Sequence, residues 1–150
     1  MASRSGLTIV QPTTLQRYPI AAGTALDHLG SIAWEFRQYL QSDLRLNASH
    51  EIKGIWFDLV QMAQEQTPVG TLPNDHVRLA RMLQPPLAPE HFDDLQSRRF
   101  GILHGWHECL CDDGTIRLMH PEVTRALIEH IKCGRCRFHF RSKRSKQDVL

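Results

Sequence analysis

The apolar pattern of this chain changes its period near residue 101, and this change limits the folds it can adopt. From about Ala25 to Phe100, apolar residues recur with the three- and four-residue spacing of helices. From Ile102 to Met119 they form two short stretches separated by Asp112-Asp113-Gly114, which suits a three-residue hairpin loop. Pro121 then opens another helical pattern. The pattern predicts a mainly α-helical α+β fold with a small β-hairpin.

Apolar stripes predict two helices in the first half of the chain. The first should cover about Ala25 to Gln41, with Trp34 and Tyr39 off its stripe and free to pack on a second element. The second should begin near Asn47, a good N-cap residue, and end near Gln66. Gly54 lies in the middle of this helix, where it costs about 1 kcal/mol relative to Ala. A close helix–helix approach at Gly54 would offset that cost.

A minor strand and two more helices complete the part before the hairpin. Gly70-Thr71-Leu72 is short and extended, and Pro73 suits the first position of a helix that ends near Leu83. Pro89 starts another helix, which ends near Arg99. The helix after the hairpin should fray near Gly134. The core-facing residues predicted on the two middle helices are Val77, Ala80, Leu83, Phe92, Leu95 and Phe100.

This order of elements is typical of a winged helix-turn-helix with an additional N-terminal helix. The length of 150 residues fits one ordinary domain. We expect an irregular N-terminal arm over residues 1–24, a winged-helix domain with its preceding helix over 25–131, and a basic C-terminal tail over 132–150.

Several segments of the chain resemble the YdaU-like family of phages, prophages and bacterial chromosomes. They are Ser42–Asn47, Gly54–Leu59, GTLPND at 70–75, LARML at 79–83 and the hairpin DDGTIRL at 112–118. Their order and spacing carry the resemblance, which covers about residues 36–131. It implies a winged-helix domain followed by a basic C-terminal region, and a role in replication initiation or in the primosome. The cysteines depart from the family pattern and leave room for a metal-binding variant.

Charge is segregated along the chain. Residues 1–131 hold 11 basic and 15 acidic residues, a net charge of −4, whereas Lys132 to Lys146 holds seven basic residues and no acid. A basic tail suggests a polyanionic partner, usually nucleic acid. Phe138 and Phe140 interleave with these cations, and aromatic rings can stack on unpaired bases. The alternatives are a solvated tail, and phenylalanines that pack on the body.

The sequence therefore predicts DNA as partner: double-stranded, and single-stranded through the tail. In helix-turn-helix proteins the second helix of the pair enters the major groove. Here that helix carries Glu90, Asp93 and Asp94 in its first turns, which weighs against strong base readout. For each arginine a solvated face or an ion pair is the alternative. The candidate DNA-binding residues are Arg78, Arg81, Arg98, Arg99, Arg117, Arg137, Arg141, Lys143, Arg144 and Lys146.

A zinc site is an alternative use of the cysteines and histidines. Cys133 and Cys136 form a CxxC, and the candidate ligands around them are His104, His107, Cys109, Cys111 and His139. The gap from Cys111 to Cys133 exceeds that of a zinc ribbon, and the first pair is only Cys-Leu-Cys. The prediction is that no cofactor or metal is required, with Cys109 and Cys111 as small buried apolar residues.

The missing motifs exclude several function classes. The chain has no phosphate-cradling Gly-rich loop, no His-Glu-x-x-His and no Gly-x-Ser-x-Gly, so we expect no enzymatic activity. No apolar run approaches the roughly 20 residues of a membrane span, and no secretory signal is evident, which favours the cytoplasm. The alternative to DNA binding is a protein-interaction module that recruits a partner of the replication or transcription machinery, or that forms a homodimer.

Overall fold

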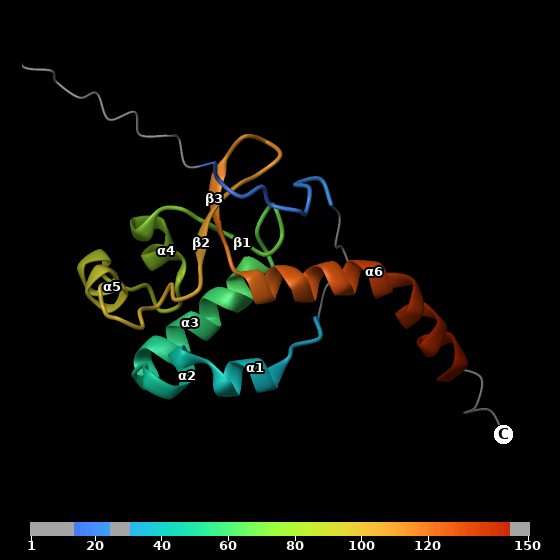
Figure 1. Cartoon of the computed structure of the whole chain (residues 1–150), viewed down its shortest axis with the longest axis horizontal. Helices are drawn as coiled ribbons and strands as arrows, with labels where there is room; N and C mark the ends of the chain where they lie inside the picture. The colour runs from blue at the N-terminus through green and yellow to red at the C-terminus, as the bar shows by residue number, and fades with distance from the viewer. Residues whose placement is uncertain (1–13, 25–30, 145–150) are drawn as a thin grey trace, which may run out of the picture.

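A computed structural model describes residues 14–24 and 31–144, with side chains as far as Cys133. The described residues form an α+β fold of six helices and one three-stranded sheet (Figure 1). Their bounds are α1 Phe36–Gln41, α2 Asp43–Asn47, α3 His50–Ala63, β1 Thr71–Pro73, α4 His76–Met82, α5 Pro89–Gln96, β2 His107–Leu110, β3 Ile116–Met119 and α6 Pro121–Arg144. None of the helices in the described part has both the length and the apolar character needed to cross a bilayer.

The sheet is antiparallel and has the strand order β1-β3-β2. The predicted hairpin is confirmed: β2 and β3 pair directly, and Cys109 lies opposite Arg117. Gly114 has a positive φ of 83° in the connecting loop, a conformation that glycine adopts at little cost. The N-terminal arm extends the sheet, because Arg17 forms a parallel bridge with Leu110 at the free edge of β2.

Helix α3 supplies much of the hydrophobic core. Its buried residues recur with helical spacing and include Ile52, Trp56 and Leu59. Trp56 donates its indole N–H to the carbonyl oxygen of His104 at 2.9 Å. Tyr39 stacks on Trp56 with ring centroids 5.7 Å apart, and Trp34 lies 6.5 Å away, as expected for residues that pack on a second element.

The first half of the chain contains shorter helices than the sequence suggested. Residues 31–35 are not helical and α1 begins at Phe36, while 25–30 lie outside the described residues. Two serines then cap the starts of new helices. The Ser42 hydroxyl accepts from the Arg45 backbone N–H at the start of α2, and the Ser49 hydroxyl accepts from the Ile52 backbone N–H at the start of α3. The predicted start of α3 near Asn47 was therefore early, and its C-terminus at Ala63 precedes the predicted Gln66.

Two further expectations were wrong around α4. Pro73 belongs to β1, where it lies opposite Arg117, and the carboxylate of Asp75 caps α4 by accepting from the Arg78 backbone N–H. Val77 is 42% exposed, although Ala80 and Leu83 are buried. The buried side of α4 runs through Leu79 and Ala80, and Val77 lies two residues before Leu79, about 200° around the helix, so it faces away from the core.

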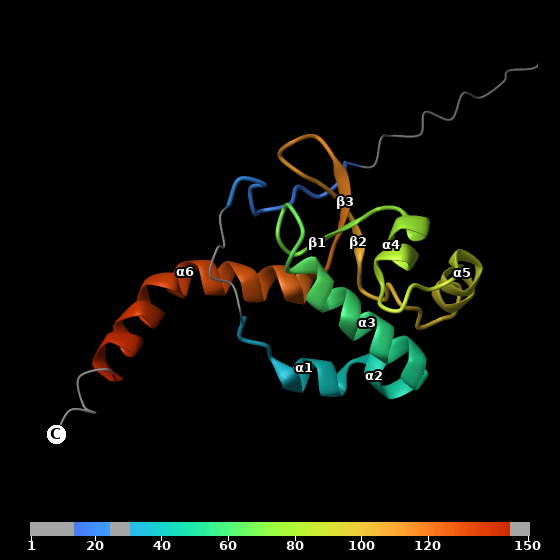
Figure 2. The same cartoon turned by 180° about the vertical axis from the view of Figure 1, so that it is seen from behind.

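Helix α6 is longer than predicted. It continues past Gly134 to Arg144 and so crosses the expected boundary between the domain and the basic tail. Val123 and Leu127, in its first two turns, are fully buried against the core. In both views the later turns of α6 leave the body and lie away from every other labelled element (Figure 1, Figure 2).

Candidate nucleic-acid interface

Two of the predicted arginines lie on the surface of α4. Arg78 and Arg81 are both exposed, and neither makes an ion pair within the described part of the chain. They are three residues apart on the helix and therefore share a side. Both remain available to a polyanion.

The two arginines after α5 already have intramolecular partners. Helix α5 ends at Gln96, so Arg98 and Arg99 follow the helix rather than forming its last turn as predicted. Arg98 forms an ion pair of 3.1 Å with Asp94, and the guanidinium of Arg99 lies 5.4 Å from the ring centroid of Phe100. Each can still reach solvent, but a phosphate would have to compete for Arg98 with a carboxylate.

Arg117 on β3 is held by the sheet rather than projecting from the hairpin. Its Nε donates to Thr71 Oγ1 at 2.8 Å, and its Nη2 donates to Gln66 Oε1 at 3.0 Å. Burial lowers the pKa of Arg117 below its ordinary value, although the side chain stays charged at neutral pH. Arg117 therefore ties β3 to β1 and to the segment after α3, and it is a weak candidate for DNA contact.

The remaining candidate residues belong to the C-terminal region. Helix α6 contains six of the seven basic residues between Lys132 and Lys146, whereas Lys146 lies outside the described residues. Lys132 is exposed. The backbone of Arg137, Arg141, Lys143 and Arg144 is helical, and their side chains lie beyond the described ones. The predicted stacking by Phe138 and Phe140 likewise lies outside the described side chains.

The hairpin cysteines belong to the core. Cys109 and Cys111 are buried, and burial raises the pKa of Cys109 to about 12, so its thiol is neutral. Tyr18 from the N-terminal arm is buried too, with its hydroxyl donating to the carbonyl oxygen of Val69 at 2.6 Å.

Among the described residues no group of three or more His, Cys, Asp or Glu side chains could hold a metal ion. Cys133 is exposed on α6, and the side chains of Cys136 and His139 are outside the described ones.

His120, which sequence reasoning passed over, lies at the start of α6. Its Nδ1 accepts from the backbone N–H of Glu122 at 3.3 Å, and its ring meets Trp56 and Trp106 edge-on at 5.6 Å each. Burial, with smaller contributions from His104 and His107, lowers the pKa of His120 to about 4. Its place just before Pro121 could have identified it as a helix cap.

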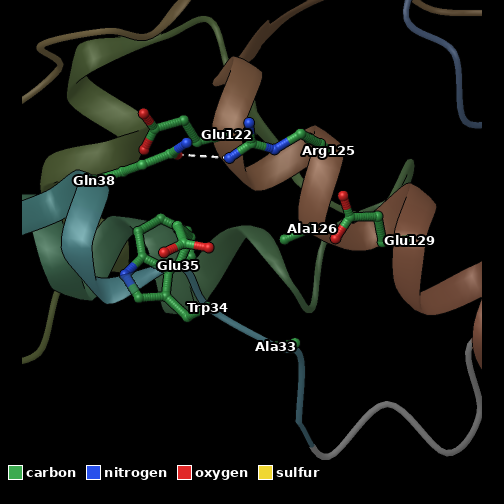
Figure 3. Close-up of a pocket in the computed structure, with 8 residues that line it drawn as sticks. All are labelled: Ala33, Trp34, Glu35, Gln38, Glu122, Arg125, Ala126 and Glu129. Atoms are coloured by element: carbon green, nitrogen blue, oxygen red, sulfur yellow. Dashed lines mark hydrogen bonds between the residues drawn. The ribbon is translucent and has the colours of Figure 1, made fainter.

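A pocket of about 290 Å³ lies between the segment that leads into α1 and the first half of α6 (Figure 3). Arg125 donates to Gln38 Oε1 at 2.5 Å across it. Three carboxylates and one arginine give the pocket an acidic character, which does not suit phosphate. The lining residues, none of them a DNA-binding candidate, are Ala33, Trp34, Glu35, Gln38, Glu122, Arg125, Ala126 and Glu129.

The chain matches no protein-family model, no curated protein and no solved structure. The similarity to YdaU-like proteins therefore stays a prediction from the sequence segments.

Proposed function

We propose that this protein binds DNA without catalysing a reaction, and that the C-terminal half of α6 makes most of the phosphate contacts. The observation that carries the proposal is the division of charge within one helix. Residues 121–131 of α6 contain one basic and two acidic residues, whereas 132–144 contain six basic residues and no acid. Such a concentration of cations on one element favours a polyanion.

The way α6 is anchored supports the same proposal. Val123 and Leu127 are buried, so the body fixes the direction in which the helix leaves it. Thirteen helical residues extend about 20 Å, and a DNA duplex carries a negative charge about every 1.7 Å along its axis. The basic half therefore has the length to meet several phosphates at once.

The rest of the proposal is that the body is a winged-helix domain. The order α3-β1-α4-α5-β2-β3 and the strand order β1-β3-β2 support this interpretation. In such a domain α5 would be the recognition helix, but it carries Glu90, Asp93 and Asp94. Asp93 already pairs with His76 at 3.0 Å. We therefore propose binding with little base readout, and a setting in phage-type replication or regulation that rests on the sequence resemblance alone.

A salt titration of DNA binding tests the proposal. Fluorescence anisotropy with labelled double- and single-stranded DNA, between about 50 and 200 mM salt, should give a linear fall of log affinity with log salt. The double variant Arg141→Glu/Lys143→Glu should reduce the slope by about 2 and weaken binding at least about tenfold. The matched control is Arg37→Glu/Arg45→Glu, which makes the same change in net charge at exposed positions of α1 and α2.

Each outcome of this titration bears on the proposal. If the α6 variant and the control weaken binding equally, the basic half of α6 makes no special contact. If the wild type does not bind either DNA at low salt, DNA binding itself is wrong.

The acidic exposed side of α5 favours a second candidate, a protein-interaction module. A helix with Glu90, Asp93 and Asp94 in its first turns repels phosphate and attracts a basic surface. Glu90→Lys separates the two uses of α5. A helix that lies against DNA should bind more tightly after this change, whereas a helix that faces a protein partner should leave DNA affinity unaltered.

A further inference from the structure

Helix α3 carries an organised stripe of residues on the side opposite the core. His50, Gly54, Phe57 and Gln61 are all exposed. Their spacing of four, three and four residues places them along one line of the helix, as in the seam of a coiled coil. Phe57 places a large apolar side chain, 49% exposed, at the centre of this line.

No contact among the described residues requires glycine at position 54. A Cβ placed on it would meet no described atom within 4 Å, and no positive φ is recorded for it. The close helix–helix approach expected from the sequence is therefore absent from this part of the fold. Glycine weakens a helix interior, but it lets a second helix come near. The geometry leaves room for that second helix to come from another molecule.

We propose that this face of α3 forms a homodimer by packing in parallel on α3 of a second copy. In this arrangement the Gly54 positions face each other at the closest approach, and the two Phe57 rings pack together one turn later. The proposal is independent of DNA binding, because it uses no residue of the basic half of α6.

Charge complementarity favours a second copy over an unrelated partner. Lys53 and Asp58 flank the stripe on opposite sides and are five residues apart. In a parallel pair of helices, a residue on one flank meets the residue five positions later on the opposite flank of the partner. Lys53 of each copy therefore meets Asp58 of the other, which gives two symmetric ion pairs. Among the described residues neither side chain forms an ion pair within the chain.

Sedimentation equilibrium of the full chain at increasing concentration tests the homodimer. The wild type should show a reversible monomer–dimer equilibrium. Lys53→Glu and Asp58→Lys should each raise the dissociation constant at least tenfold, because each replaces two attractions by two repulsions. The double variant Lys53→Glu/Asp58→Lys should restore it to within threefold of the wild type. Arg81→Glu, at an exposed position of α4, is the control and should leave the dissociation constant unchanged.

The stripe itself is tested by Phe57→Ala and Gly54→Gln, each of which should raise the dissociation constant at least tenfold. Both positions are exposed, so circular dichroism should show that the variants remain folded. The proposal is overturned if the wild type stays monomeric at hundreds of micromolar. It is also overturned if a dimer forms whose dissociation constant neither Phe57→Ala nor Gly54→Gln raises. The same holds if the double charge variant dimerises no more tightly than the single charge variants.

Discussion

The sheet region and the C-terminal half of α6 both carry the residue types that suggest a binding site, but the fold treats them in opposite ways. In the sheet, Cys109 and Cys111 are buried and Arg117 is hydrogen-bonded to Thr71. These groups hold strands together and have little capacity left for a ligand. In α6, the basic residues lie on turns that extend beyond the packed core (Figure 2). Residue type alone therefore does not identify a site; what matters is whether the fold has already used the side chain.

The largest expected effect is a loss of stability within α6 itself, and it tests this contrast directly. Leu127 is fully buried and packs so close to Gly70 that a Cβ at that position would clash with its Cδ1, whereas Ile131, one turn later, is 40% exposed. Leu127→Ala should lower the free energy of unfolding by about 2–5 kcal/mol, because it removes buried methyl groups and leaves a cavity. Ile131→Ala is the matched change and should cost less than about 1 kcal/mol. Chemical denaturation measures both, and equal losses would contradict the division of α6 into an anchored and a free half.

The next test concerns the buried start of α6. The pKa of His120 is about 4 in the folded protein and 6.5 when unperturbed, so the unfolded state binds the proton more readily. The contribution of His120 to stability is complete above pH 6.5 and is lost as the pH falls towards 4, on the order of 3 kcal/mol in total. His120→Asn keeps an acceptor for the Glu122 N–H but cannot titrate. Denaturant melts at several pH values should show a flatter profile for this variant between pH 6.5 and 4, and a profile parallel to that of the wild type would refute the assignment.

The smallest effect is expected at Arg117. Arg117→Met retains the apolar stem but leaves Thr71 Oγ1 and Gln66 Oε1 without their donor, which should cost about 1–3 kcal/mol. Arg81→Met, at an exposed position of α4, should change stability by no more than about 0.5 kcal/mol. Thermal melts check stability, and the anisotropy assay checks function. A large loss of DNA affinity in a stable Arg117 variant would show that Arg117 contacts DNA.

Much of the fold was readable from local sequence signals. The hairpin loop at Asp112-Asp113-Gly114, the start of α5 at Pro89 and the start of α6 at Pro121 all lie where the sequence placed them. The errors were also local, since Ser49 and Asp75 were not recognised as caps and the starts of α3 and α4 were misplaced. The candidate site stays a prediction: its arginines were identified by charge alone, and sequence could not show the intramolecular partners of Arg98, Arg99 and Arg117.

The sequence by itself determined the charge division of the chain, the hairpin and the helix starts at proline, because each depends on neighbouring residues. Only the tertiary structure decided which side chains stay free. Arg117 reaches Thr71 and Gln66, 46 and 51 residues away, and the indole of Trp56 reaches the carbonyl of His104, 48 residues away. Such contacts form when distant segments pack on one core. They occupy the hydrogen-bonding capacity of charged and polar groups that, from the sequence alone, could equally have bound a ligand.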